Sequence, residues 1–298
     1  MSKRIATHNG HYHSDDIFAV ATLCIYLEGE DVEILRTRDA SLIESADFVV
    51  DIGGGHDPER CIFDHHQEGG AGKRPNGIPY ASFGLVWKRY GSELSGGDEE
   101  AELVDRKLVQ PIDAEDNGVE VSKEVFDNVD PYTIQDFFYA FIPTWREDDI
   151  DVDTVFKNCV DIAKRLLKRE IGKAKDKKDA ERLIREELGS SVEEKVIVLD
   201  RYLPWKDVVT EYPDPLFVVY PATNGESWHV QAVPLEKGTL ATRLPFPDSW
   251  AGKRDEELVE ATGVEDAVFC HNGRFLAVAS SKEGALELAQ RVIEGVSQ

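Results

Sequence analysis

Three adjacent residues with metal-binding side chains, Asp64-His65-His66, follow the apolar segment 61–63 and precede the glycine-rich segment 69–72. At the expected end of a strand, they place carboxylate oxygens and imidazole nitrogens in one small region. Alone, such a group is more often a surface feature than a set of metal ligands. More residues of these types follow other apolar runs of the sequence: His8, His11, His13, Asp15, Asp51 and Asp113. This repetition predicts a metal site.

Hydrolysis of a phosphoester is the chemistry that such residues suit. The reaction needs an activated water and neutralised phosphoryl oxygens, and two metal ions about 3.5–4 Å apart supply both. Mixed histidine and aspartate ligands suit Mn, Fe, Co or Zn, whereas an all-oxygen set would suit Mg better. The candidate ligands have this mixed character: His8, His13, Asp15, Asp51, His65 and Asp113.

The elements that must position these residues are short strands separated by helical patterns. Ser14 is expected to begin a helix whose apolar residues recur at helical spacing, and Asp113 is expected at the end of the apolar run 110–113. We predict strands over 4–7, 31–36, 48–52 and 61–64 and further helices near 80–90 and 99–108. This alternation predicts an α/β fold with a mainly parallel sheet, whose loops at the carboxyl ends of the strands share one crevice.

The second half of the chain has a different pattern. Residues 151–188 are expected to be helical almost throughout, and Asn272-Gly273 between apolar runs predicts a β-hairpin. Short β-type runs are expected at 196–199, 216–220, 228–233, 267–271 and 275–279, before a final helix at 282–295. We therefore predict three parts: a domain over 1–150 with the metal site, a helical linker over 151–190, and a smaller α+β domain over 191–298.

The charge composition of the chain limits which molecules it can bind. The 298 residues carry a net charge of −24, which argues against broad binding to duplex DNA, where phosphate neutralisation dominates affinity. A short single strand or a small phosphorylated substrate stays open, because a metal centre supplies its own positive charge. The segment 164–185 has ten Lys/Arg against four Asp/Glu. It predicts a solvated helix face, with a nucleic-acid track as the alternative.

A cytoplasmic location is expected. No apolar run approaches the roughly 18 residues that would suggest a membrane helix, and the first residues lack the apolar core of a signal peptide. The four cysteines form no CxxC pair, which fits a reducing compartment.

The motifs together resemble a known family. Asp64-His65-His66 resembles the motif that names the DHH phosphoesterase superfamily. His13 stands where that superfamily usually has an aspartate, and this departure resembles one branch, the melanocyte-proliferating-gene exonuclease family. Similar segments extend over nearly the whole chain: 7–16, 49–54, 63–67, 112–118, 199–205, 228–234, 243–245, 249–252 and 269–271.

The resemblance implies a DHH-type catalytic domain with two divalent metal ions, Mn²⁺ being preferred and Mg²⁺ or Co²⁺ kept open. It implies that His66 contacts the scissile phosphate or a leaving oxygen and that Asp64 orients a histidine. One ion would be held by His8, His13 and Asp51, and the other by Asp15, Asp51, His65 and Asp113, so that Asp51 bridges them. In a C-terminal substrate-binding domain, phosphate or ribose contacts would come from Arg243, His271 and Arg274.

The implied activity is that of a 3′–5′ exonuclease on single-stranded RNA or short oligonucleotides. Two alternatives stay open: a phosphoesterase of small molecules or of cyclic or linear dinucleotides, and a metal-bound binding or scaffold protein without activity. A homodimer also stays open. Some residues have plainer interpretations: His11 and His56 as solvent-facing or loop residues, and Asp116-Asn117-Gly118 as a turn in which Asp116 could support Asp113.

Overall fold

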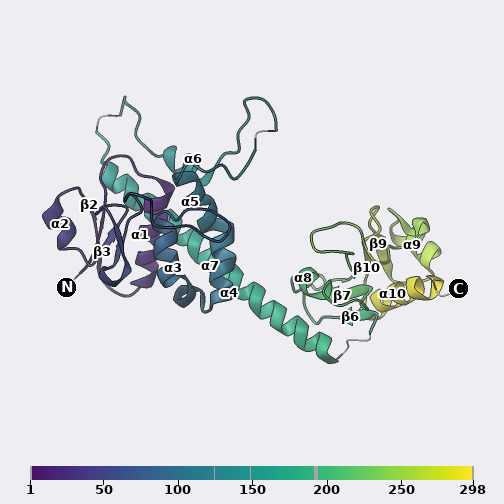
Figure 1. Cartoon of the computed structure of the whole chain (residues 1–298). Helices are drawn as coiled ribbons and strands as arrows, with labels where there is room; N and C mark the ends of the chain where they lie inside the picture. The colour runs from purple at the N-terminus through teal and green to yellow at the C-terminus, as the bar shows by residue number, and fades with distance from the viewer. Residues whose placement is uncertain (1, 124, 148, 191–193, 297–298) are drawn as a thin grey trace. The chain divides into compact units, whose positions relative to one another are not determined.

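The computed structural model describes residues 2–123, 125–147, 149–190 and 194–296 (Figure 1). The chain forms two compact units, Met1–Asp176 and Lys177–Gln298. We describe each unit by itself.

A five-stranded mixed sheet lies at the centre of the first unit. Its strands are β1 (Lys3–Thr7), β2 (Val32–Arg36), β3 (Phe48–Val50), β4 (His56–Asp57) and β5 (Ile62–Phe63), in the order β2-β1-β3-β5-β4. β1 is parallel to β2 and β3, and β3 is parallel to β5, whereas β4 is antiparallel to β5. The prediction of a mainly parallel sheet is therefore confirmed for this unit.

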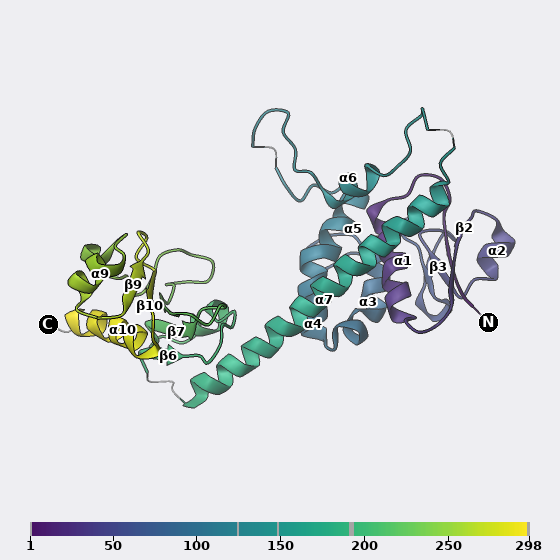
Figure 2. The same ribbon diagram turned by 180° about the vertical axis from the view of Figure 1, so that it is seen from behind.

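Helices cover this sheet. They are α1 (Ser14–Tyr26), α2 (Ala40–Glu44), α3 (Ser82–Ser95), α4 (Asp98–Val104), α5 (Gln110–Asp116), α6 (Ile134–Tyr139) and α7 (Val152–Ser190), with a 3₁₀ turn at Pro58–Arg60 and a π-helical turn at Asp105–Val109. α1 is almost wholly apolar from Ile17 to Leu23 and is buried there. Phe18 stacks on Phe83 of α3 with ring centroids 5.2 Å apart. The first half of α7 packs on the same core through Phe156 and Leu167 (Figure 2).

One local prediction in this unit is wrong. Asp113 was expected at the end of an apolar strand-like run, but it lies inside helix α5. Residues 98–116 are helical throughout, as α4, the π-helical turn and α5. Pro111 stands in the first turn of α5, where its missing N–H costs nothing. A short apolar run cannot by itself distinguish a buried helix from a buried strand.

A second mixed sheet, mainly antiparallel, forms the other unit. Its strands are β6 (Val196–Val198), β7 (Phe217–Pro221), β8 (Trp228–Ala232), β9 (Ala267–Cys270) and β10 (Leu276–Ala279), in the order β6-β7-β8-β10-β9. β6 is parallel to β7, and the other pairs are antiparallel. The predicted hairpin at residues 271–274 joins β9 to β10.

Two apolar clusters stabilise this unit. One contains α9 (Asp255–Thr262), α10 (Lys282–Val296) and the 3₁₀ turn Asp248–Trp250, packed on Val230 and Ala277. The other contains α8 (Lys206–Val209), Trp205 and Val218, joined by Ile184 and Leu188 from the end of α7.

The charged part of α7 is engaged in ion pairs. Lys168 pairs with Glu28, Lys177 with Asp207, and Arg185 with Glu211. These pairs favour the solvated-face interpretation of the basic segment over a nucleic-acid track. Within the described residues, no helix is both long and apolar enough to cross a membrane.

Candidate metal centre

The three parallel strands at the middle of the first sheet end beside one another. His8 follows β1, Asp51 follows β3, and the segment 64–66 follows β5. Parallel neighbours present their carboxyl ends at the same edge of a sheet. α1 begins at the same edge, with His13 as its N-cap residue and Asp15 and Asp16 in its first turn. The local folding of this edge therefore gathers the candidate ligands.

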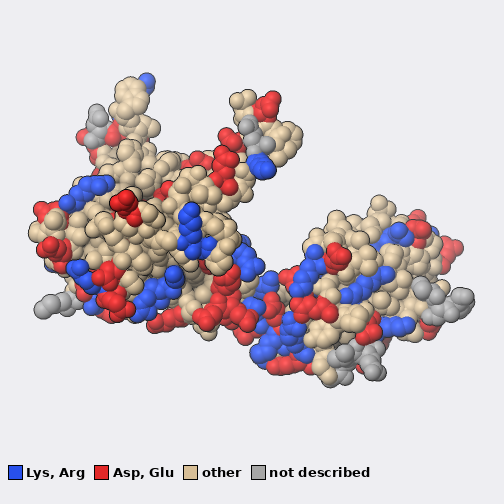
Figure 3. Space-filling model, viewed as in Figure 1, with Lys and Arg blue, Asp and Glu red and all other residues tan. Residues whose placement is uncertain are grey.

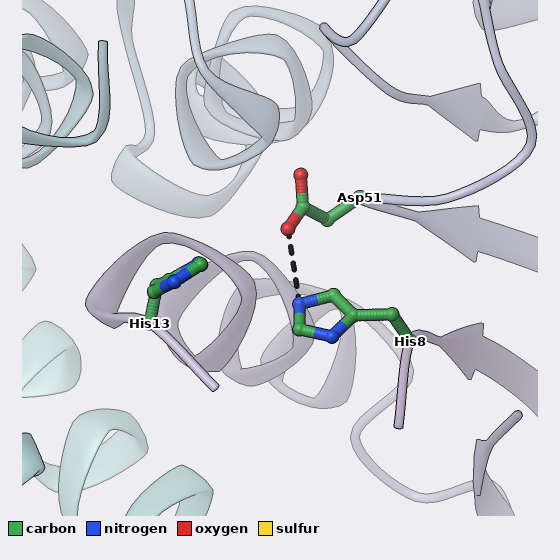
Figure 4. Close-up of side chains that lie close together, drawn as sticks. All are labelled: His8, His13 and Asp51. Carbon is green, nitrogen blue, oxygen red and sulfur yellow. Dashed lines mark ion pairs between the residues drawn. The ribbon is translucent and has the colours of Figure 1, made fainter. Parts of the chain in front are cut away.

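Asp51 lies between two histidines. Its Oδ2 is 3.3 Å from Nε2 of His8, and its Oδ1 is 3.3 Å from Nε2 of His65. Figure 4 shows His8 and Asp51 with His13 beside them, and its dashed line marks the His8–Asp51 pair. Asp51 has a positive φ of 55°, a strained backbone conformation that accumulates at functional sites. The two oxygens of one carboxylate thus face two separate nitrogen ligands.

Three groups of side chains bring their ligand atoms within 4.8 Å of one another: His8 with His13 and Asp51, Asp51 with His65 and His66, and Asp15 with His65 and Asp116. Asp51 belongs to two of these groups, and so does His65. The groups therefore form one connected cluster rather than separate sites.

Several polar atoms in this cluster and beside it are buried without a hydrogen bond in the described part of the chain: Nε2 of His8, Nε2 of His65 and Oδ2 of the neighbouring Asp16. Nε2 of His8 and Oδ2 of Asp16 lie 3.1 Å apart. Buried polar atoms are normally satisfied. Unsatisfied nitrogen and oxygen atoms that converge are the donor set that a cation requires, so these residues fit a metal centre.

The electrostatics agree with this interpretation. Burial alone would lower the pKa of His8, but Asp16 and Asp51 outweigh it and raise the pKa to about 10. For His65, Asp116 and Asp51 likewise outweigh burial and raise the pKa to about 11. These carboxylates therefore favour positive charge where the histidine nitrogens meet.

Carboxylates in the cluster repel one another. Burial and the charges of Asp116 and Asp51 hold the pKa of Asp15 well above its usual value. Burial also raises the pKa of Asp16. Burial opposes ionisation of Asp51 too, but His65 and His8 dominate and lower its pKa. A bound cation would relieve this accumulation of negative charge.

The first turn of α3 orients three of the carboxylates. Asp15 accepts hydrogen bonds from the backbone N–H groups of Ser82 (3.1 Å) and Phe83 (2.7 Å). The Ser82 hydroxyl donates to Oδ1 of Asp51 at 3.0 Å, and the backbone N–H of Gly84 donates to Asp113 at 2.9 Å. The amide groups at a helix N-terminus favour such anions.

Arg36, the last residue of β2, holds the loop between His8 and His13. Its Nη2 donates to the carbonyl of Gly10 at 2.6 Å, and its Nη1 pairs with Asp153 at 2.8 Å. The guanidinium is almost fully buried, and a buried charge-assisted bond of this kind restricts the loop. The sequence patterns give no sign of this contact.

His66 is the exposed member of the clustered groups, and Asp64 lies beside it without belonging to any of them. Asp64 is buried; its Oδ2 accepts the N–H of Gly54 at 2.6 Å, and its Oδ1 lies 2.8 Å from Nδ1 of His66. The His66 side chain is 61% exposed. Asp64 therefore orients a ring whose other nitrogen, Nε2, is directed away from this contact.

Asp113 belongs to none of the three clustered groups of described residues. It is fully buried, and its Oδ2 accepts a hydrogen bond from Nη1 of Arg74 at 2.6 Å. Burial raises its pKa to about 7 against the opposing effects of Arg74 and Gly84. Asp116, three residues later, lies 3.0 Å from Nε2 of His65. Reading residues 110–116 as a helix would have placed both carboxylates on one face.

The predicted phosphate-binding residues lie in the second unit. Arg243 donates to the carbonyls of Thr210 (2.9 Å), Tyr212 (2.6 Å) and Pro215 (2.8 Å). Three of its five N–H groups are thus already used. A role in phosphate binding stays a prediction for Arg243.

His271 and Arg274 lie at the β9–β10 hairpin. Nδ1 of His271 accepts the N–H of Gly273 at 2.9 Å, and Arg274 pairs with Asp248 at 2.7 Å. Within the described residues, no hydrogen bond or ion pair joins Arg243 to either of them. A shared phosphate-binding role stays a prediction for these residues as well.

Comparison with known proteins places the chain among named relatives. The model of a family described as uncharacterised protein family UPF0160, under the name MYG1 exonuclease, matches residues 4–293. The human protein named MYG1 exonuclease is 31% identical over 326 residues, which cover 97% of this chain and 85% of that protein. MYG1 proteins of Schizosaccharomyces pombe and Chlamydia trachomatis are each 28% identical, over 98% and 99% of this chain and 97% and 98% of theirs.

One solved structure, a pGpG-specific phosphodiesterase named PggH from Vibrio cholerae, aligns over 99% of this chain and 98% of its own. The TM-score is 0.29 and the sequence identity 14%. A similarity of this degree carries no argument about fold or activity.

Proposed function

This chain belongs to the MYG1 exonuclease family (UPF0160), and on that premise we propose that it hydrolyses phosphodiester bonds with two divalent metal ions. The name of the human relative, an exonuclease, supports a hydrolase acting on phosphoester bonds. The observation that carries the proposal is the position of Asp51 between His8 and His65, whose buried Nε2 atoms lie 3.0–3.3 Å from carboxylate oxygens.

The proposed ligands follow from the three groups. Asp51 is the shared ligand, because its two oxygens face different histidines. Asp116 takes the place expected for Asp113, since it reaches His65 while Asp113 is bound to Arg74. We assign His8, His13 and Asp51 to one ion, and to the other the group Asp15, His65 and Asp116 with Asp51, which reaches His65. A mixed nitrogen and oxygen set of this kind favours Mn²⁺, with Co²⁺ and Mg²⁺ as the alternatives.

When bound, two such ions supply a water of lowered pKa and positive charge beside the phosphoryl oxygens. The chain's own residues do the rest. Asp64 fixes the ring orientation of His66 through Nδ1, so that Nε2 can exchange a proton with a phosphate or leaving oxygen. Ser82 holds Asp51 in place. A positioned acid or base of this type typically contributes 10²–10⁴-fold to a rate.

Single-stranded RNA or a short oligonucleotide is the proposed substrate, attacked from its 3′ end. The net charge of −24 disfavours long polyanions unless a basic track attracts them. Figure 3 shows acidic and basic side chains interspersed on both units in this view. The same charge favours the second candidate, a phosphodiesterase of dinucleotides or other small phosphodiesters.

The test is hydrolysis of end-labelled RNA, DNA, dinucleotides and mononucleotides, each with Mn²⁺, with Mg²⁺ and with excess chelator. We expect cleavage of short RNA or dinucleotides with Mn²⁺ and none with chelator. Asp51→Asn should abolish it, whereas His11→Ala should leave it unchanged, because His11 is exposed and outside the clustered groups. Full activity in chelator would contradict the proposal.

A further inference from the structure

A pocket of about 500 Å³ lies in the second unit, at the hairpin between β7 and β8. Its walls include Tyr202, Tyr220, Ser227 and His229. Its volume lies in the range of small-molecule sites, roughly 300–1,000 Å³. The three residues Arg243, His271 and Arg274 do not line it.

One wall of the pocket is aromatic and fixed. The Tyr220 ring is 5% exposed, and its hydroxyl donates to Oε1 of Gln231 at 2.8 Å. The ring of Tyr202 lies 5.4 Å from it at an angle of 60°, and the ring of His229 lies 5.3 Å from it at 72°. Tyr202 is 54% exposed. It therefore presents open aromatic surface beside a rigid ring.

Polar groups without partners accompany this surface. Among the described residues, no hydrogen bond engages the His229 ring or the hydroxyls of Ser227 and Tyr202. Burial lowers the pKa of His229. The ring is therefore neutral at pH 7, with one donor and one acceptor nitrogen. A ligand with a hydrogen-bonding edge would satisfy these groups.

The pocket lacks charge. Of the described residues that line it, none is Lys, Arg, Asp or Glu. A phosphate group would find no cation there, so an anionic ligand is disfavoured. The walls suit a flat, uncharged ring that stacks on an aromatic side chain and hydrogen-bonds along its edge, and a nucleobase has both features.

We propose that this pocket binds a nucleobase of the substrate, with Tyr202 as the stacking surface and His229 and Ser227 at the base edge. The identification of the base as part of a substrate rests on the proposed function. The pocket would act on substrate affinity and not on bond cleavage, because nothing in it belongs to the metal cluster.

The test is direct binding of adenosine and uridine to the full chain in excess chelator, by ligand-observed NMR and calorimetry, with ribose as the base-free probe. We expect saturable binding of at least one nucleoside and none of ribose. Tyr202→Ala should weaken binding about tenfold, or about 1.4 kcal/mol. Tyr202→Phe should bind like the wild type, because it keeps the ring.

A matched control is Tyr132→Ala, which removes a 71% exposed tyrosine of the first unit; it should not change binding. Binding of neither nucleoside, equal binding of ribose, or normal binding by Tyr202→Ala would overturn the proposal. The assay contains no metal and measures no hydrolysis. The two proposals can therefore fail separately. If the protein binds a nucleoside through Tyr202 but hydrolyses none of the tested substrates, the base-binding proposal is supported and the proposed function is rejected.

Discussion

Nε2 of His65 lies 3.0 Å from Oδ2 of Asp116, although one residue follows a strand and the other ends helix α5. Asp113, three residues before Asp116, is bound to Arg74 instead. Two carboxylates on one helix therefore have different surroundings: one faces the clustered ligands and the other closes a buried ion pair.

This difference predicts opposite phenotypes. Asp116→Asn should lower metal content and activity, and it should destabilise the metal-free protein less than Asp113→Asn, although it weakens the Asp116–His65 pair. Asp113→Asn should lower the free energy of unfolding by about 1–3 kcal/mol, because it removes one hydrogen-bond partner of the buried Arg74, which keeps its pair with Asp105. Chemical denaturation of the metal-free variants and metal analysis would separate the two effects. Equal loss of metal in both variants, with no loss of stability in Asp113→Asn, would contradict the assignment of Asp116 to the metal site and of Asp113 to the ion pair with Arg74.

The sequence predicted most of this edge of the first unit because its signals are local. Strand ends after apolar runs place His8, Asp51 and His65 correctly beside one another. The position of Asp116 depends on the packing of α5, and the run 110–113 does not by itself indicate this helix. Contacts between distant segments, such as that of Arg36 with Gly10, leave no periodic pattern in a sequence.

His66 and Asp64 should affect turnover and not metal content. His66→Ala removes the exposed imidazole of the cluster, and we expect a 10²–10⁴-fold loss of the hydrolysis rate. Asp64→Asn should cost about 10–100-fold, since it disturbs the orientation of the ring and the hydrogen bond from Gly54 without removing the imidazole. Steady-state kinetics with parallel metal analysis would test both. Loss of bound metal in His66→Ala would make that residue a ligand and not a substrate contact.

Gly84 provides a test of the packing around α3. A methyl group at this position would clash with the carboxylate of Asp113 and approach Arg74 within 3.0 Å. We expect Gly84→Ala to lower the free energy of unfolding by about 1–3 kcal/mol. Gly172→Ala is the control, because Gly172 is helical and has open space around it; it should be neutral or stabilising by about 0.5–1 kcal/mol. Thermal and urea unfolding would measure both.

Replacing Arg243 tests whether this residue has a structural role or binds substrate. Its guanidinium holds three backbone carbonyls, so Arg243→Ala should destabilise the second unit by about 2 kcal/mol. Arg201→Ala, which removes an exposed arginine of the same unit, should not. A stable Arg243→Ala protein with a raised KM would instead favour the phosphate contact that the sequence suggested.

The second unit also shows that contacts between distant segments cannot be predicted from local sequence patterns. Its strands and hairpin were predicted closely, because alternation and Asn272-Gly273 are local signals. The partners of Arg243 come from residues 28 to 33 positions earlier. A basic residue in a sequence motif gives no indication of whether it faces a ligand or a carbonyl of its own chain.

The number of metal ions per chain tests the central claim most directly. The purified protein should be stripped with chelator, reloaded with Mn²⁺, and analysed by calorimetric titration and elemental analysis, alongside Asp51→Asn and the control His11→Ala. We predict two ions per chain for the wild type and His11→Ala, and at most one for Asp51→Asn, because in the proposed centre both ions would share this carboxylate. One ion or none in the wild type, or two in Asp51→Asn, would contradict a centre bridged by Asp51.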